Sequence, residues 1–374
     1  MHKVTIKYVH IMVQRNMTYC ATRHAFRHFS CIYFRASPVC WAITPCRNFS
    51  ETMEPERLDT IVVCSRAAWG ARQRGGDILL DLKSIVPSPL RSLKWRLQWL
   101  SGTEAFERAP VSSTLKFMRW TALELLDRDA EFHTAEGIRL TSMAKNFSSL
   151  SVYLTGQRDP ELQAFIASRL KPGQVFVDVG ANIGVYSVFA SRLVGPSGRV
   201  LAIEANPGTH RYLADNMARN GLSNVATLNC AVGDADGHLQ ISTDRRNAGA
   251  THVAISDEKG ATIRVRRLDD ILREQGVECV NYLKIDVEGY ELPVLRGAID
   301  MIRGSPDIVV QTELIPAHAG RYGHSIRAIV ELLTGAGLTA YSPDAQGRAL
   351  AVGINEIDRH MDLLWMRSPR GMAN

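Results

Sequence analysis

The sequence predicts an α/β protein with a doubly wound, mainly parallel sheet, preceded by an N-terminal accessory region. From residue 174 onward, short β-branched runs alternate with stretches of helical periodicity, which is the pattern of βαβ units. A glycine turn follows the first run, and acidic residues follow several of the others. The chain has 374 residues, enough for two domains or for one large domain with an extension.

The elements of this α/β body follow one another in a regular order. Residues 175–179 form a β-branched run, and residues 185–194 a helix that Gly195 and Pro196 close. Further strands are predicted at 200–203, 225–228, 280–285 and 308–310, and further helices at 207–220, 292–302 and 326–333. Such sheets bind ligands outside the carboxyl ends of their strands, where the strand order reverses. We therefore expect the chemistry to lie just after the strands.

The remaining segments give coarser predictions. Leu90–Leu100 has helical spacing with three cations, and it either touches a membrane surface or a partner, or packs on the body with its charges in solvent. Residues 239–242 and 262–265 are expected to pair as a hairpin. The polar span between them is either a lid over the site or an irregular surface loop. Helices are also expected at 114–126 and 160–170, and strands within 137–151.

The excess of positive charge and most of the cysteines lie in the first fifty residues. This segment holds 7 Lys and Arg and no acid, whereas residues 51–374 hold 37 basic and 38 acidic residues. We expect residues 1–52 to be a disordered tail or an over-extended start, with an organelle-targeting presequence as the alternative. The body has no basic cluster and no long apolar run, which argues against nucleic-acid binding and a membrane span. The cysteine spacing matches no zinc pattern and indicates reduced thiols in a cytoplasmic protein.

The turn after the first strand has the features of a nucleoside site. Gly180 permits the positive φ of a tight turn, and Gly184 lets the helix pack closely or lets a ligand approach its start. The free N–H groups of this helix start can hold an anion. Asp178 is expected to point into the cleft. Glu204, at the end of the second strand, is expected to accept the ribose hydroxyls.

The same turn discriminates between cofactors. A diphosphate cofactor requires G-x-G-x-x-G, but Asn182 occupies the middle position here. Asp178 would repel a diphosphate and suits a cationic group, such as the sulfonium region of S-adenosylmethionine. We therefore predict S-adenosylmethionine as the cofactor. The alternative is a purely structural glycine turn with Glu204 facing solvent.

Three charged residues alternate at the end of the strand 280–285. Lys284, Asp286 and Glu288 point to one side because side chains of a strand alternate between its faces. An exposed strand would show the same pattern, but the apolar residues between them indicate a sheet end that opens into the cleft. Together with Glu313, which follows the next run, they are candidates for substrate binding or proton handling.

Five segments in order resemble the FkbM-type methyltransferases. They are Val177–Gly184, Glu204–Pro207, Arg267–Asp270, Lys284–Glu291 with Leu295–Ala298, and Glu313. The resemblance covers roughly residues 140–340 and implies a class I, Rossmann-like methyltransferase that uses S-adenosylmethionine, usually for O-methylation. It implies cofactor positions at Asp178, Gly180, Asn182, Gly184 and Glu204, and places Lys284, Asp286 and Glu288 near the transferred methyl group.

Two departures and a domain plan follow from this resemblance. Ala205 stands where the family commonly has proline, which affects the stiffness of the turn more than the chemistry. No acid follows the third strand at Asn229–Ala231, so we expect backbone groups there, including those of Ala231, to bind adenine. The domains expected are the tail 1–52, a mainly helical accessory region 53–139, and an FkbM-like domain 140–374.

The chemical hypothesis gives Asp286 the central part. Asp286 is expected to act as the general base or to orient the acceptor, and it is also expected to contact the cofactor. Lys284 is expected to stabilise a developing oxyanion. Glu313 and Glu288 are the next choices for the base, and two histidines, His252 and His324, are expected in loops as further alternatives. No metal is predicted, although Mg²⁺ held by Asp286, Glu288 and Glu313 is a minor alternative.

The acceptor is predicted only by class. It is a hydroxyl on a glycan, a lipid or another small molecule, and the oligomeric state stays open. One rival is a non-catalytic protein that binds S-adenosylmethionine or a partner on the same fold. A lesser rival is an NAD-dependent oxidoreductase.

Overall fold

The computed structural model describes residues 33–36, 39–42, 60–63, 78–81, 93–244, 247–255, 260–359 and 362–368. The chain divides into two units, Met1–Val86 and Pro87–Asn374. In the first unit, β1 (Tyr33–Ala36) pairs with β2 (Val39–Ala42), and β3 (Thr60–Val63) pairs with β4 (Ile78–Asp81), both antiparallel. The interpretation of residues 1–52 falls largely outside the described residues. The predicted boundaries at 52/53 and 139/140 stay predictions.

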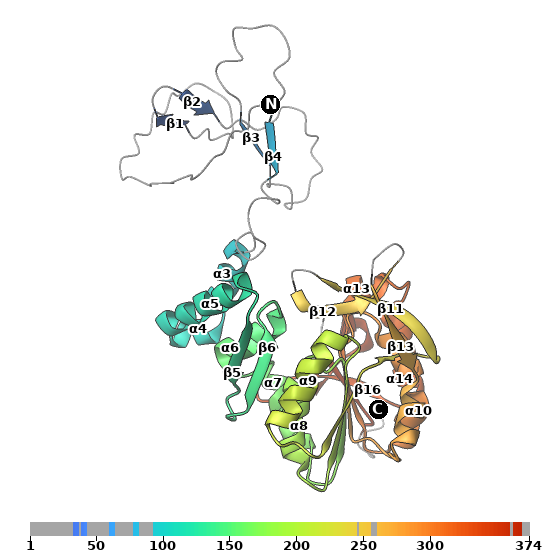
Figure 1. Ribbon diagram of the computed structural model, residues 1–374. Helices are drawn as coiled ribbons and strands as arrows, with labels where there is room; N and C mark the ends of the chain where they lie inside the picture. Colours follow the sequence, from blue (N-terminus) through green and yellow to red (C-terminus); the bar gives the residue numbers. More distant parts are fainter. Residues whose placement is uncertain are drawn as a thin grey trace. The chain divides into compact units, whose positions relative to one another are not determined.

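An eight-stranded sheet forms the core of the second unit, which confirms the predicted α/β class (Figure 1). Its strand order is β17-β16-β18-β15-β14-β7-β8-β9. The strands are β7 (Val175–Val179), β8 (Arg199–Ile203), β9 (Val225–Leu228), β14 (Tyr282–Ile285), β15 (Val309–Glu313), β16 (Thr339–Pro343), β17 (Ala349–Ala351) and β18 (Asp362–Met366). The neighbouring strands β15, β14, β7, β8 and β9 are parallel to one another. Strands β18, β16 and β17 pair antiparallel with their neighbours. The strand order reverses between β7 and β14, so a ligand crevice is expected at their carboxyl ends.

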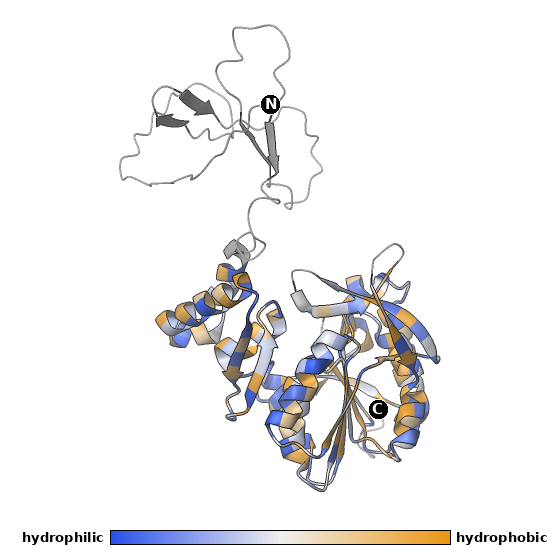
Figure 2. Cartoon of the chain, in the orientation of Figure 1, coloured by the Kyte–Doolittle hydropathy of each residue, from blue (hydrophilic) through white to orange (hydrophobic). Residues whose placement is uncertain are grey.

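Helices cover both faces of the sheet (Figure 1). On one face lie α7 (Pro160–Arg169), α8 (Val185–Val194) and α9 (Pro207–Arg219), and on the other α10 (Leu268–Glu274), α11 (Glu291–Arg296), α12 (Ile299–Gly304) and α14 (Ile326–Gly335). Alternate strand residues serve the two cores: Phe176 packs with α7 and α8, and Val177 with α10 and α11. In Figure 2 the helices carry hydrophobic and hydrophilic residues on different sides, as this packing requires.

The predicted helix 292–302 is divided into α11 and α12. A Cβ at Gly297 would overlap the carbonyl oxygen of Gly233, so the chain passes close to a neighbouring segment between the two helices. Asp269, a residue of α10, caps the start of α12, since its carboxylate accepts the Met301 N–H at 3.0 Å. A long-range carboxylate thus caps the second helix, which local periodicity cannot reveal.

A second, four-stranded sheet follows β9. It has the order β10-β13-β11-β12 and consists of β10 (Ala231–Val232), β11 (Gly237–Asp244), β12 (Asn247–Val253) and β13 (Ala261–Arg266). The expected hairpin is confirmed, because Leu239 lies opposite Ile263 in an antiparallel pair. The interpretation of the intervening span as an irregular loop is wrong for residues 247–253, which form β12 against β11.

Residues 93–155 form an additional layer, called here the N-terminal layer. Its elements are α3 (Leu93–Ser101), α4 (Glu104–Arg108), α5 (Pro110–Leu125), β5 (Asp129–His133), β6 (Arg139–Met143) and α6 (Phe147–Thr155). Phe117, Trp120 and Leu150 share a core with Ile183 and Leu213, so this layer packs on the α8–α9 side of the sheet. Within the described residues, no helix is long and apolar enough to cross a membrane.

Two predictions for this layer need correction. Strands were expected within 137–151. The strand β6 forms there, but Asn146 then starts the helix α6 by accepting the Ser149 N–H at 3.3 Å. The cations of the Leu90–Leu100 helix were expected in solvent or on a partner. Arg96 instead is buried and forms an ion pair with Glu124 of α5.

Candidate active site

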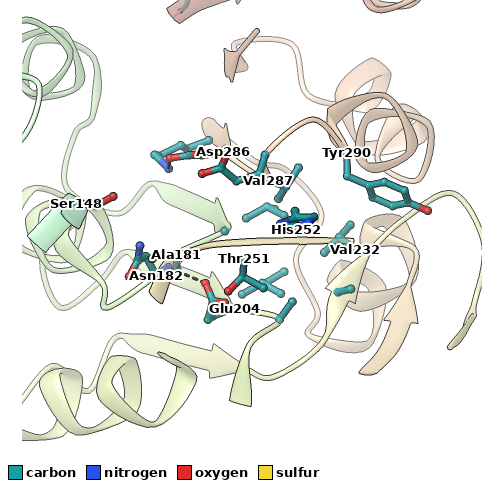
Figure 3. Close-up of a pocket in the computed structure, with 18 of the residues that line it drawn as sticks. Ser148, Ala181, Asn182, Glu204, Val232, Thr251, His252, Asp286, Val287 and Tyr290 are labelled. Atoms are coloured by element: carbon teal, nitrogen blue, oxygen red, sulfur yellow. Dashed lines mark hydrogen bonds and ion pairs between the residues drawn. The ribbon is translucent and has the colours of Figure 1, made fainter. Parts of the chain in front are cut away.

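A pocket opens at the carboxyl ends of β7, β8 and β14 (Figure 3). Its volume is about 1080 Å³ with its open mouth included, which is ample for a small-molecule ligand. Of the predicted site residues, those that line it are Gly180, Asn182, Glu204, Ala231, Lys284, Asp286, Glu288 and Glu313. This is the edge of the sheet at which the sequence predicts a ligand site.

Asp178 lies beneath the pocket rather than in its wall. Its side chain is fully buried, and its Oδ2 accepts a hydrogen bond from the Ser187 hydroxyl of α8 at 2.7 Å. Its Oδ1 lies 3.6 Å from Lys284 Nζ on the neighbouring strand. The expectation that Asp178 points into the cleft is wrong because the pleat of β7 directs it toward α8. Its charge therefore acts on Lys284.

The two glycines of the turn serve contacts within the protein. Gly180 has a φ of 81°, and a Cβ there would overlap the carbonyl oxygen of Asp286, so the loops after β7 and β14 touch. Gly184 has a φ of 94°, and a Cβ there would lie 2.7 Å from Leu213 Cδ1 of α9. Of the two roles considered for Gly184, the structure supports close packing of the helix.

Most N–H groups of this turn are already bonded within the protein. The N–H groups of Gly180 and Ala181 donate to the Ile203 carbonyl at 2.9 and 3.0 Å. The Asn182 N–H donates to Glu204 Oε2 at 2.9 Å, the dashed line in Figure 3. The expectation that the free N–H groups of the helix start hold an anion concerns the residues from Gly184 onward and stays a prediction. A diphosphate would find few donors at this turn.

Glu204 is a buried acid held by two backbone groups. Besides Asn182, the N–H of Asn206 donates to its Oε1 at 2.8 Å. Burial raises the pKa of Glu204 to about 7, although these two hydrogen bonds act in the opposite direction. Each carboxylate oxygen keeps a further lone pair for a ligand hydroxyl. Glu204 thus does not face bulk solvent.

Lys284 and Asp286 form the charged end of the pocket. Lys284 Nζ lies 3.2 Å from Asp286 Oδ2 and 4.9 Å from the centroid of the Tyr186 ring. Burial alone would raise the pKa of Asp286, but Lys284, Arg158 and a hydrogen bond with Glu313 hold it below its usual range. Asp286 is therefore ionised at neutral pH.

Glu313 is in the opposite protonation state. Burial, followed by the nearby carboxylates Asp286, Asp362 and Glu288, raises the pKa of Glu313 to about 9. At neutral pH the raised pKa favours a protonated Glu313 beside an ionised Asp286. Two carboxyl groups whose environments drive their pKa values apart are a recognised arrangement for acid–base chemistry.

Glu288 and His252 line the pocket, whereas His318 and His324 lie outside its lining. Glu288 Oε2 lies 3.2 Å from His318 Nδ1, and burial raises the pKa of Glu288 and lowers that of His318. His252 lines the pocket, but it lies on β12 and not in the expected loop. His324 packs against the rings of Tyr290 and Tyr322, with its ring 6.4 Å from the Tyr290 centroid, outside the pocket lining.

Sequence reasoning missed Arg158 and Tyr186. Arg158 lines the pocket, its Nε lies 3.1 Å from Asp159 Oδ2, and the Tyr186 hydroxyl donates to the same oxygen at 2.8 Å. The segment Arg158–Pro160 looks only like the start of a helix. Its place in the site comes from the packing of α7 beside α8, for which the sequence holds no local signal.

The described part of the chain lacks the ligand sets that metal ions need. Among the residues that the structure describes, no group of three or more His, Cys, Asp or Glu side chains is placed to hold a metal ion.

The fold and pocket together define a doubly wound α/β protein with a nucleoside-type site. Residues 178–338 match the family model described as the methyltransferase FkbM domain. This match covers the segments in which the motifs lie and confirms the resemblance seen in them.

Several characterised relatives are similar over the same region. The chain is 32% identical over 163 residues to methyltransferase sdnD of Sordaria araneosa, which covers 35% of this chain and 62% of the relative. It is 28% identical over 167 residues to hexuronic acid methyltransferase AglP of Haloferax volcanii, covering 45% and 64%. It is 32% identical over 162 residues to 31-O-demethyl-FK506 methyltransferase FkbM of Streptomyces tacrolimicus, covering 35% and 62%. The chain thus spans less than two thirds of the length of these relatives.

The cofactor of this domain is S-adenosylmethionine, and the pocket fits it. Glu204, Ala231 and Val232 line the pocket, so a carboxylate that could accept hydrogen bonds from hydroxyl groups and two apolar side chains are available to a ligand. Among the described lining residues, the Lys and Arg side chains are Lys284 and Arg158, and both are paired with carboxylates. These paired cations leave little positive charge for a diphosphate, whereas the carboxylates of the lining can attract a sulfonium or an ammonium group.

Proposed function

We propose that this protein transfers a methyl group from S-adenosylmethionine to a hydroxyl oxygen of a small-molecule acceptor. The observation that carries this proposal is Asp286, a carboxylate that lines the pocket beside the turn after β7 and whose Oδ2 lies 3.2 Å from Lys284 Nζ. An acceptor hydroxyl needs a base of this kind to lose its proton as the methyl group arrives.

Each group of the pocket receives a role in this proposal. When bound, the cofactor supplies an electrophilic methyl group on a sulfonium sulfur. Glu204 and the turn at Asn182 hold the nucleoside part, with the wall at Ala231 against the base. Binding both reactants in one pocket supplies proximity and alignment, which is the larger part of such catalysis.

Asp286 orients the acceptor hydroxyl and accepts its proton. Glu313 donates a hydrogen bond to Asp286 and thereby fixes its orientation. Lys284 lies between Asp178 and Asp286 and keeps Asp286 ionised. We assign this role to Lys284 in place of the stabilisation of an oxyanion. Glu288, paired with His318, faces the mouth where an acceptor enters.

The acceptor class follows from the relatives only in outline. One relative is named for a hexuronic acid and another for 31-O-demethyl-FK506. We therefore propose a hydroxyl of a glycan, a lipid or another small molecule as acceptor. A screen with methyl-labelled S-adenosylmethionine against these three classes tests the proposal, and label in an ether product is the expected result.

Two other outcomes of this screen have defined meanings. Cofactor binding without label transfer to any acceptor class would support a non-catalytic binding protein instead. Tight binding of a nicotinamide dinucleotide with no response to S-adenosylmethionine would support an oxidoreductase.

A further inference from the structure

Asn146 joins the N-terminal layer to the cofactor turn. It is fully buried at the start of α6, where its Oδ1 accepts the Ser149 N–H at 3.3 Å. Its other polar atom, Nδ2, donates to Asn182 Oδ1 at 2.7 Å. One side chain therefore caps a helix of the layer and also binds the residue in the middle of the turn.

Two hydrogen bonds hold Asn182 in the turn. Asn182 has a φ of 52°, in the left-handed region, which asparagine adopts more readily than most other residues with a side chain. The backbone N–H of Asn182 donates to Glu204 Oε2 at 2.9 Å, and the side-chain oxygen of Asn182 accepts a hydrogen bond from Asn146. The two bonds together fix the residue that separates β7 from the start of α8.

A third segment meets Asn146 at the same point. A Cβ at Gly249 of β12 would overlap Asn146 Oδ1 and would lie 3.2 Å from Asn182 Nδ2. The position therefore needs glycine to let β12 lie against the layer. Ser148 of α6 and Thr251 of β12 both line the pocket, on different sides of it in Figure 3. The N-terminal layer thus contributes a wall of the pocket, and Asn146 sets its distance from β12.

We propose that Asn146 is a positioning residue for cofactor binding, and that the N-terminal layer completes the cofactor pocket through it. This inference rests on the proposed function. It assigns a task to residues 93–155, all of which precede the matched family region that begins at residue 178.

The test uses a variant that separates helix capping from positioning. Asn146→Ser keeps a favourable N-cap for α6, but the serine side chain is too short to reach Asn182. We expect the Kd for S-adenosylmethionine and for S-adenosylhomocysteine, measured by calorimetry, to rise about tenfold, as loss of one buried hydrogen bond predicts. The melting temperature should stay close to that of the parent.

Asn224→Ser is the matched control. Asn224 Nδ2 donates to the carbonyls of Ser191 and Gly195 at 3.0 and 2.9 Å, at the end of α8 away from the pocket. This variant should lower the melting temperature and leave both Kd values unchanged. A merely structural role for Asn146 would give the same pattern as this control.

A second variant tests the contact with β12. Gly249→Ala should weaken cofactor binding by crowding Asn146, and the loss should be smaller than additive when Asn146→Ser removes the crowded atom. An unchanged Kd for Asn146→Ser, or losses that add independently, would overturn the inference. Failure of the parent chain to bind S-adenosylmethionine would instead contradict the proposed function, so the two failures are distinguishable.

Discussion

Asp286 and Glu313 end neighbouring parallel strands and are both acids, yet they hold opposite protonation states. The difference comes from their neighbours: Lys284 and Arg158 face Asp286, whereas carboxylates surround Glu313. The sequence places both acids at strand ends, since the position after a buried strand is readable. It does not show Arg158, which arrives from a helix start far away in the chain.

Asp286→Asn tests the base. The amide cannot accept the proton, so we expect turnover to fall by about 10²–10⁴-fold. The affinity for S-adenosylmethionine should change by a few-fold only, because Glu204 and the turn remain. Turnover with the labelled cofactor and calorimetric affinity measure the two effects. Normal turnover with retained binding would remove Asp286 from the mechanism.

Glu313→Gln tests the protonated carboxyl. The pKa of Glu313 is raised from its ordinary value of 4.5 to about 9 in the folded protein, so between these values the folded form binds a proton that the unfolded form has lost. The stability that Glu313 contributes is therefore complete below pH 4.5 and is lost as the pH rises to about 9.

The measurement is urea unfolding between pH 7 and pH 9. In this range the parent should lose stability as the pH rises, and Glu313→Gln should show a shallower loss, because the amide cannot ionise. Equal pH dependence of the two proteins would contradict a raised pKa at Glu313.

At the scale of the element, the turn between β7 and α8 is where local sequence is most informative. A glycine pair after a β-branched run predicts a strand, a turn and a helix start, and residues 175–179 and 185–194 form them as predicted. What it cannot show is which partner each group finds. Ile203 and Glu204 bind the N–H groups of the turn from another strand, and Asp178 faces α8.

Gly180→Ala tests the contact of the two loops. A methyl group there combines positive φ with overlap of the Asp286 carbonyl, so we expect a loss of about 2–5 kcal/mol in the free energy of unfolding. Gly276→Ala is the matched control, since Gly276, in the turn that ends α10, has a φ of 64° with nothing within 4 Å of a Cβ. It should cost about 1 kcal/mol. Equal losses for both variants would show that the Asp286 contact contributes nothing.

On the scale of the whole molecule, the N-terminal layer and the sheet share one core. The alternation of strands and helices predicts the sheet, because it repeats along the chain. The burial of Arg96 is not predictable in this way, since it depends on Glu124 in a different helix. The pairing of β12 with β11 was likewise missed, because a polar span carries no hydrophobic alternation.

Arg96→Met tests this core. Arg96 Nη2 lies 3.0 Å from Glu124 Oε1, and the side chains are 8% and 3% exposed. Removing the cation leaves a buried carboxylate, so we expect a loss of about 3–5 kcal/mol in the free energy of unfolding. The double variant Arg96→Met with Glu124→Leu should recover most of this loss. A small effect of the single variant, measured by urea unfolding, would show that the pair is not buried in solution.

The central claim is that the pocket at the ends of β7, β8 and β14 accepts S-adenosylmethionine and not a dinucleotide. Calorimetric titration of the full chain with S-adenosylmethionine and, separately, with NAD⁺ tests it most directly. We expect saturable binding of S-adenosylmethionine and no binding heat with NAD⁺, because the turn's N–H groups are engaged by Ile203 and Glu204. Saturable binding of NAD⁺ together with no response to S-adenosylmethionine would contradict the account.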